Sequence, residues 1–234
     1  MNGLIALVGA GEYLPVMDNV DRYLLDSLKV QKPRVVCMPT AAGQEGDESV
    51  NRWSRMGVEH FTKLGADVTA LPIIDKASAN DEQYLSTLEN ANFIYFSGGN
   101  PQYLYETMNG SRAWSAMQKA WSNGAVYAGC SAGAMILSER IPSFRLAGTV
   151  EGFDIVPAKF ILPHFDAIPL VFKPLTATLK VQLKKGERML GIDENTALVG
   201  SLGSEWKVLG SSKVHLFTRE DSKVYENGQT LLLN

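Results

Sequence analysis

The chain has 234 residues, of which 45% are hydrophobic and 20% are charged, with a formal net charge of -3. Length and composition are typical of one globular domain with a large core, so we expect a single α/β domain over residues 1–234. The slightly acidic balance and the lack of a polybasic cluster exclude a nucleic-acid partner and an anionic lipid surface. No apolar run approaches the roughly 18 residues of a transmembrane helix, so we expect no membrane partner either.

The two cysteines indicate the compartment. Cys37 and Cys130 both fall in predicted buried strands. Two cysteines in a chain of this size make no disulfide framework, which favours a reducing, cytoplasmic setting. Residues 1–8 lack a charged n-region and are predicted to form a first core strand rather than a signal peptide.

The first 135 residues alternate apolar strand runs with helical stretches. This pattern predicts a parallel sheet with helices on both faces. The predicted strands cover residues 4–8, 34–38, 67–71, 93–96 and 125–130, and the predicted helices cover about 17–29, 47–64, 80–90, 101–109 and 112–122.

After residue 140 the pattern changes to shorter runs. We expect one more helix over about 168–184, strands at 190–193 and 197–199, and alternating runs at 206–209, 214–217 and 223–225. Asn227-Gly228 is a strong two-residue hairpin signal in this tail. The C-terminal part therefore predicts antiparallel strands at the edge of the sheet, within the same domain.

The segment Gly129-Cys130-Ser131-Ala132-Gly133 follows an apolar strand and precedes a helix-compatible run. It is G-x-S-x-G in the context that gives this motif meaning. Small residues two positions on either side of Ser131 let strand and helix pass closely, and its hydroxyl then projects from a strained turn. The motif predicts Ser131 as a hydrolase nucleophile, with the Ala132 N–H as an oxyanion donor. The alternative is a glycine-rich turn that binds a phosphate or only packs tightly.

Cys130, next to Ser131, is intrinsically the better nucleophile. The register argues against it, because an elbow centred on Cys130 would place alanines where glycines are needed. We expect Cys130 to fill the core as a small apolar residue. A Cys130-dependent amidase stays an alternative hypothesis.

A glycine pair, Gly98-Gly99, follows the fourth predicted strand, at the same carboxyl edge of the sheet as the elbow. Ligands of parallel sheets bind along that edge. We expect the Gly99 N–H to be the second oxyanion donor, and Gly98, Asn100 and Gln102 to contact substrate. The alternative is a plain turn into a helix that Asn100 caps.

Three histidines could serve as the base. His164 follows Pro163 at the end of a short apolar run, where a loop is exposed. His60 is expected on a helix, partly exposed, and His215 is expected to be structural. Only His164 stands at the right kind of strand end, so we expect it to take the proton of Ser131.

The chain resembles the dipeptidase E/cyanophycinase family of serine peptidases. The resemblance covers residues 4–200 and rests on an ordered set of segments: residues 7–12, 38–41, 97–100, 129–133, 163–165 and 191–199. It implies a class I glutamine amidotransferase-like fold, with a flavodoxin-like parallel sheet. It also implies Ser131 as nucleophile, His164 as base, and the N–H groups of Gly99 and Ala132 as the oxyanion hole.

The third triad member, an acid, matches no motif of the family residue by residue. The candidates are Glu139, Glu151, Asp154 and Asp166, and we favour Glu151. Leu162 stands where cyanophycinase-like members carry Asp, two positions before the histidine. No arginine occurs between His164 and Arg188, so the family's aspartyl specificity is not carried over.

Asp193 and Glu194 are adjacent at a predicted strand end. Such a pair suggests a metal site or paired acid–base carboxylates. Adjacent side chains in a strand point to opposite sides, so the pair is a poor chelate, and we expect neither a metal nor a cofactor.

The leading prediction is a serine-type peptidase that cleaves a small peptide or amide through an acyl-enzyme, as a monomer or homodimer. The alternative from another class is a non-catalytic binding protein that lacks a complete triad.

Overall fold

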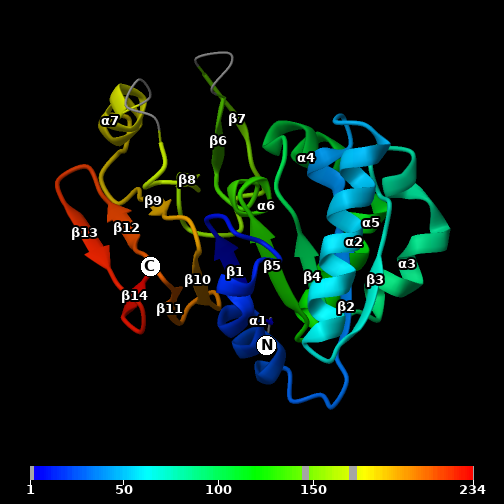
Figure 1. Cartoon of the computed structure of the whole chain (residues 1–234). Helices are drawn as coiled ribbons and strands as arrows, with labels where there is room; N and C mark the ends of the chain where they lie inside the picture. The colour runs from blue at the N-terminus through cyan, green and yellow to red at the C-terminus, as the bar shows by residue number, and fades with distance from the viewer. Residues whose placement is uncertain (1–2, 144–147, 169–172, 234) are drawn as a thin grey trace.

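The computed structural model describes residues 3–143, 148–168 and 173–233. Its largest element is an eight-stranded sheet in the order β14-β11-β10-β1-β5-β4-β2-β3 (Figure 1). A four-stranded sheet, β13-β12-β9-β8, and a two-stranded hairpin, β6-β7, complete the strand pairing.

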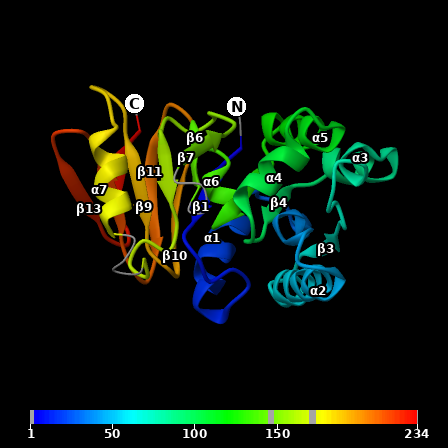
Figure 2. The ribbon, with the colours of Figure 1, turned by 90° about the horizontal axis from the view of Figure 1, so that it is seen from above.

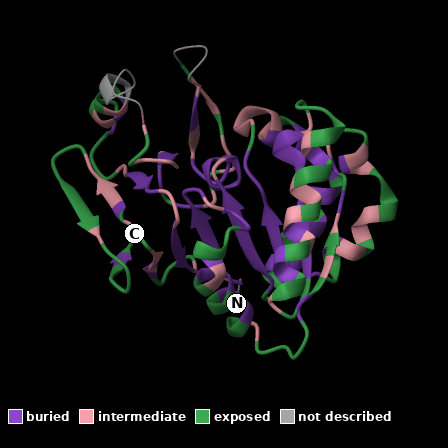
Figure 3. Cartoon of the chain, viewed as in Figure 1, coloured by how far each residue is buried: buried purple, intermediate pink, exposed green. Residues whose placement is uncertain are grey.

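Five strands from the first 130 residues are parallel. They are β1 (Ile5–Val8), β2 (Arg34–Met38), β3 (Asp67–Ala70), β4 (Phe93–Phe96) and β5 (Val126–Cys130). Apart from β3, they are apolar and almost wholly buried, as expected for parallel strands covered on both faces. Figure 3 shows them inside helices whose outer faces are exposed.

The side chains of these strands alternate between two cores. Ala6 and Val8 of β1 pack on one face of the sheet, and Ile5 and Leu7 pack on the other. The first face is covered by α1 (Asp18–Ser27) and α2 (Asp47–Lys63). The second is covered by α3 (Glu82–Glu89), α4 (Pro101–Met108) and α5 (Arg112–Ser122), as Figure 2 shows.

Side chains cap the three helices of the second face. Asp81, Asn100 and Ser111 each accept a backbone N–H in the first turn of α3, α4 and α5. The cap by Asn100, followed by Pro101 at the first helical position, is the start signal that the sequence carries. It places the beginning of α4 directly after the glycine pair that follows β4.

The remaining strands come from the second half of the chain. β10 (Thr196–Gly200) pairs antiparallel with β1, and β11 (Glu205–Gly210) and β14 (Thr230–Leu232) extend that edge. The smaller sheet contains β8 (Phe160–Leu162), β9 (Met189–Ile192), β12 (Val214–Phe217) and β13 (Ser222–Tyr225). The hairpin is formed by β6 (Arg140–Ser143) and β7 (Gly148–Glu151). The short helices are α6 (Ala132–Met135), α7 (Lys173–Val181) and the 3-10 turns Pro15–Met17, Thr40–Ala42 and Ser78–Asn80.

The predicted α/β class, the parallel sheet covered on both faces and the antiparallel C-terminal edge are confirmed. One expectation about the C-terminal part is corrected. The turn at Asn227-Gly228 does not close a hairpin, because β13 and β14 on either side of it belong to different sheets. The predicted helix over 168–184 is present as α7, while residues 169–172 lie outside the described residues. The separate sheet around β9 was not predicted.

The contact between β5 and α6 requires glycine at position 129. A Cβ atom there would lie 2.3 Å from the carbonyl carbon and oxygen of Gly133, and both atoms belong to the backbone. Strand and helix therefore approach as closely as the elbow motif predicts. This close approach fixes the direction in which the residue between them points.

We expect Gly129→Ala to destabilise the protein by about 3 kcal/mol, because the added methyl forces the strand and helix apart. Chemical unfolding in urea measures this cost. Gly124→Ala is the matched control, since a Cβ there meets open space and only its backbone conformation, with a φ of +100°, is strained. We expect the control to cost only about 1–2 kcal/mol. Equal costs for the two variants would contradict the steric argument.

Candidate active site

Ser131 occupies the turn between β5 and α6, at the carboxyl edge of the parallel sheet (Figure 1). Its backbone has a φ of 49° and a ψ of -104°, which is an uncommon conformation for a non-glycine residue. Its N–H donates to the carbonyl of Val8 on the neighbouring strand at 2.9 Å. Its own carbonyl accepts the N–H groups of Ala134 and Met135, both at 3.0 Å. The strained turn is thus held from both sides, with the hydroxyl partly accessible to solvent.

His164 brings its imidazole to this hydroxyl from the loop after β8. Its Nε2 lies 3.2 Å from Ser131 Oγ, which is within hydrogen-bond reach. Its Nδ1 lies 2.7 Å from Oε1 of Glu194. The side chains of His164 and Glu194 are 44% and 40% exposed, so a ligand from solvent can reach the three groups. A hydroxyl, an imidazole and a carboxylate in this order can activate a serine for nucleophilic attack.

The carboxylate beside His164 is not the one that we favoured from the sequence. Glu151, at the end of β7, stands opposite Arg140 in the β6–β7 pairing. It lies beside Tyr105, where burial and then the charge of Glu151 raise the pKa of the phenol. The hairpin thus directs Glu151 toward α4 and away from the imidazole. Within the described residues, Glu194 is the carboxylate that contacts His164, and Glu139 and Asp154 make no such contact.

Sequence reasoning missed Glu194, although a signal for it was present. Glu194 lies in the connection formed by residues 193–195, where the chain passes from β9 in the small sheet to β10 in the large sheet. The segment 191–199 was among those that carry the family resemblance, and it places two acids at a strand end. In the sequence this pair suggests a metal site or paired acid–base carboxylates, and not an orienting acid for His164.

Asp193 and Asp166 support the segment that carries Glu194. Asp193 is buried and accepts hydrogen bonds from Ser212 Oγ at 2.8 Å and from the backbone N–H of Lys213 at 3.2 Å. The two adjacent carboxylates have different partners, since that of Glu194 contacts His164. Asp166 Oδ1 accepts the backbone N–H of Glu194 at 2.8 Å. Asp166 therefore joins the loop of His164 to the loop of Glu194 and does not contact the imidazole as a third triad member would.

The glycine pair after β4 lies against Ser131. A Cβ atom on Gly98 would be 3.3 Å from Ser131 Cβ and 3.9 Å from its Oγ. Gly99 has a φ of +143°, and a Cβ there would strike the backbone of Ala41. Within the described part of the chain, the N–H groups of Gly99 and Ala132 donate to no protein acceptor. They are free to donate to an oxyanion, the use that we expected for them.

The other residues expected near substrate have partners of their own. Asn100 Oδ1 caps α4 by accepting the N–H of Tyr103 at 3.1 Å. Gln102 Nε2 donates to Glu106 Oε1 at 2.8 Å on the exposed side of the same helix. Gly98 is the member of this set whose proximity to Ser131 is given directly by the structure.

The two remaining histidines lie in other surroundings. His60 is buried, not partly exposed as expected, because its Nε2 lies 2.7 Å from Oδ2 of the buried Asp21. His215 Nε2 lies 3.0 Å from Asp193 Oδ1, and its ring packs against Phe165. His215 thus helps to hold the loop around Asp193, in agreement with the structural role expected for it.

Cys130 is fully buried, and its thiol donates to Glu12 Oε2 at 2.9 Å. Burial, followed by the nearby charge of Glu12, raises the pKa of this thiol well above its usual value. Burial also raises the pKa of the Cys37 thiol to about 12. Since the thiolate is the reactive form, neither cysteine has the properties of a nucleophile. These properties argue against the Cys130-dependent amidase.

We expect iodoacetamide to modify neither Cys37 nor Cys130 in the folded protein, and to leave peptidase activity unchanged. Raised pKa values keep both thiols protonated at neutral and mildly alkaline pH, and burial excludes the reagent. Peptide mapping after alkylation, with the urea-unfolded protein as the positive control, measures this. Alkylation of folded Cys130 with loss of activity would restore the cysteine hypothesis.

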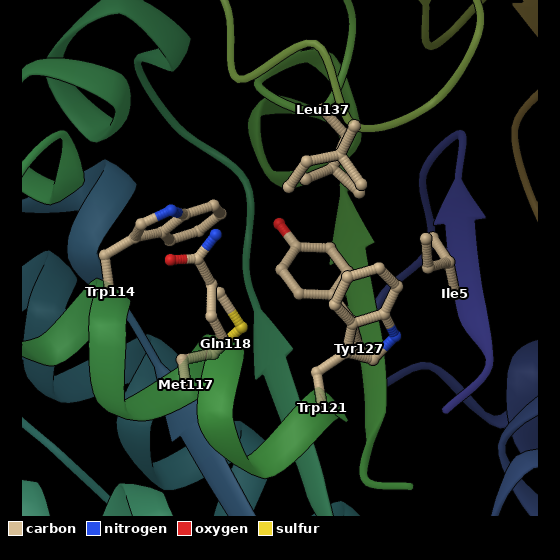
Figure 4. A pocket seen from close by; sticks show the side chains of 8 residues that line it. Ile5, Trp114, Met117, Gln118, Trp121, Tyr127 and Leu137 are labelled. Atoms are coloured by element: carbon tan, nitrogen blue, oxygen red, sulfur yellow. The ribbon is translucent and has the colours of Figure 1, made fainter. Parts of the chain in front are cut away.

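The molecule also contains a small apolar pocket between α5 and the strands β1 and β5 (Figure 4). It is lined by Ile5, Trp114, Met117, Gln118, Trp121, Tyr127, Leu137 and Ile155. Its volume is about 10 Å³, which is room for about one water molecule. It is too small to bind a peptide.

Comparison with known proteins agrees with this geometry. A family model described as peptidase family S51 matches residues 5–204. The chain belongs to peptidase family S51. As an S51 member the protein is a serine-type peptidase, a hydrolase that acts on peptide bonds, which confirms the function and the family predicted from the sequence.

Several proteins are similar to this S51 peptidase in structure or in sequence. A crystal structure of a peptidase from an acI-B1 Actinobacterium is similar with a TM-score of 0.90 and 33% identity, over 99% of this chain and 97% of that one. An uncharacterized peptidase, YgaJ, of Bacillus subtilis (strain 168) is 27% identical over 175 residues, which are 71% of this chain and 70% of that protein. A cyanophycinase of Synechococcus elongatus is 25% identical over 172 residues, 69% of this chain and 52% of that enzyme. In the described part of the S51 peptidase, no helix has the length and apolarity needed to span a membrane.

Proposed function

We propose that the protein cleaves small peptides through an acyl-enzyme on Ser131, with His164 as general base and Glu194 as the orienting acid. The observation that carries this proposal is the unbroken series of contacts from Ser131 Oγ to His164 and on to Glu194. Only one of the contacts, that of Ser131 with His164, was expected from the sequence. The carboxylate that contacts the imidazole belongs to Glu194, which lies in a different segment from the acid favoured from the sequence.

In the proposed first step, Ser131 Oγ attacks the carbonyl carbon of the scissile bond, and its proton passes to His164 Nε2. The negative oxygen of the tetrahedral intermediate accepts hydrogen bonds from the N–H groups of Gly99 and Ala132. The imidazolium then gives its proton to the leaving amine as the C–N bond breaks. Glu194 holds the Nδ1–H tautomer and stabilises the imidazolium while it carries the extra proton.

In the second step, water replaces the amine. His164 takes a proton from this water, the hydroxide attacks the acyl carbon, and Ser131 leaves with the proton returned by the imidazolium. The segment from Gly98 to Asn100 and the start of α4 with Gln102 form the proposed wall beside the substrate. This assignment is supported by the closeness of Gly98 to Ser131.

The alternative of a non-catalytic binding protein depended on the lack of a matched acid. The contact of Glu194 with His164 argues against that alternative, since a carboxylate lies 2.7 Å from the imidazole. No observation on the described residues favours the alternative over the peptidase.

A fluorophosphonate probe tests the proposed nucleophile without knowledge of the substrate, because it reacts only with an activated serine. We expect stoichiometric labelling at neutral pH, mapped to Ser131, and no labelling after unfolding in urea. Labelling at another serine, or no labelling of the folded protein, would overturn the proposal. The expected small-peptide preference is tested separately with pools of di-, tri- and longer peptides, by release of free amine.

A further inference from the structure

Glu12 is a buried carboxylate beneath the candidate active site that the proposed mechanism does not use. It lies after β1, and only 8% of its surface is exposed. Its Oε1 accepts the backbone N–H of Gly98 at 2.9 Å, and its Oε2 accepts the thiol hydrogen of Cys130 at 2.9 Å. These partners lie 86 and 118 residues away in the sequence, so the carboxylate links three separate segments of the chain.

The two partners of Glu12 occupy equivalent places in the site. Gly98 immediately precedes Gly99, the proposed oxyanion donor, and Cys130 immediately precedes Ser131, the proposed nucleophile. The strands that lead to them, β4 and β5, are neighbours in the sheet, and β1 lies on the other side of β5. Glu12 therefore reaches from the end of β1 across the end of β5 to the end of β4.

The glycine pair needs an external tether of this kind. Two consecutive glycines have wide backbone freedom, and the orientation of the Gly99 N–H depends on it. On the far side of the pair, the N–H of Asn100 donates to the Ala41 carbonyl at 2.9 Å. On the near side, the Gly98 N–H donates to Glu12. The pair is thus held at both ends, with the Gly99 N–H between the two tethers.

The contacts of Glu12 differ from those of a structural ion pair. Burying a carboxylate is costly unless it is hydrogen-bonded, and pairing with a cation is the usual compensation. Here the partners are a backbone amide and a thiol, both beside the reacting groups. The carboxylate of Glu12 also packs tightly against Gly98, since a Cβ atom on Gly98 would lie 3.0 Å from Glu12 Oε1.

From these contacts we propose that Glu12 is a positioning residue of the oxyanion hole: its carboxylate fixes Gly98, and through it the direction of the Gly99 N–H. This inference rests on the proposed oxyanion role of Gly99. Glu12 touches neither the hydroxyl nor the imidazole, so it acts on the orientation of a donor and not on proton transfer. The length of the side chain, which lets it reach both donors, matters more than its charge.

Two variants separate length from charge. Glu12→Gln keeps the length and an acceptor for the Gly98 N–H but loses the charge. Glu12→Asp keeps the charge but is one methylene too short to reach both partners. We expect Glu12→Asp to lower the rate constant of fluorophosphonate labelling at Ser131 by about 100-fold, the lower end of the loss of one oxyanion donor. We expect Glu12→Gln to retain at least a tenth of the wild-type rate.

The pH dependence of labelling and the stability of the variants complete the test. The midpoint of the labelling rate against pH should stay at the wild-type value in both variants, because His164 is untouched. Cys130→Ser, which offers an O–H to the same carboxylate, is the matched control and should label within a few-fold of the wild type. Thermal unfolding shows which variants are folded; if Glu12→Asp does not fold, a Glu12→Gln rate below a tenth of the wild-type rate still contradicts the positioning role.

The outcomes distinguish this inference from the proposed function. If wild-type Ser131 is not labelled, the proposed function fails. If it is labelled and Glu12→Asp labels as fast as the wild type, or Glu12→Gln is slower than Glu12→Asp, the positioning role is wrong. A shifted pH midpoint would also overturn it, because Glu12 would then act on the imidazole.

Discussion

Replacing Ser131 by alanine is expected to lower the rate of peptide hydrolysis by about 10⁵- to 10⁶-fold, because no other group of the site can form the acyl-enzyme. The fold should not suffer. Serine and alanine both carry a Cβ, so the unusual backbone at this position, with a φ of 49°, is equally strained in both. The Ser131 N–H, which donates to Val8, is also retained. Release of free amine from a peptide pool measures the rate, and thermal unfolding checks that the variant is folded.

Cys130→Ala is the matched control for Ser131→Ala. It changes the neighbouring residue, which is fully buried and points away from solvent. We expect it to retain activity within about tenfold of the wild type, since only a hydrogen bond to Glu12 is lost. If Ser131→Ala stays active while Cys130→Ala is inactive, the nucleophile has been assigned to the wrong residue.

The second large effect is expected at Glu194. Glu194→Gln should lower kcat by about 10³- to 10⁴-fold, because the neutral amide no longer stabilises the imidazolium and can hold the wrong tautomer of His164. The side chain keeps its length, so its place beside Nδ1, 2.7 Å away in the wild type, is still filled. The measurement is kcat and KM on the best peptide of the pool, and we expect KM to change little.

Glu151→Gln is the control that tests the correction to the sequence prediction. Glu151 lies beside Tyr105 on the α4 side of the site, so its loss should change kcat by no more than about twofold, as for most exposed positions. Asp166→Asn should fall between the two, because Asp166 only holds the backbone N–H of Glu194. If Glu151→Gln were inactive and Glu194→Gln active, the acid would be Glu151, and the geometry around His164 would change during the reaction.

The elements of the parallel sheet were predictable because their signals are local. Apolar runs bounded by capping residues predict β1 to β5 and the helices between them, and Asn100 caps α4 as expected. The elbow that presents Ser131 was predictable for the same reason. The spacing of Gly129 and Gly133 around Ser131 is a steric requirement of one continuous turn, and it appears in the sequence as a pattern of five residues.

The residues that reach the surroundings of Ser131 from distant segments were predicted less well. His164 was found because it follows an apolar run and because a serine nucleophile needs a base. Glu194 was missed, since nothing in its immediate neighbourhood says that β9 and β10 belong to different sheets. His60 was expected to be partly exposed, but it is buried in contact with Asp21, a residue 39 positions away in the sequence.

The sequence by itself determined the α/β architecture and the serine at the elbow, because strand and helix periodicity and the sterics of a tight turn act between residues close in the chain. The peptidase class followed from the resemblance of its ordered segments to a known family. Only the tertiary structure decided which carboxylate stands beside His164 and that Glu12 links Gly98 to Cys130. Those contacts join segments 30 to 118 residues apart. They depend on where one strand leaves a sheet and another enters it, and no short stretch of sequence carries that information.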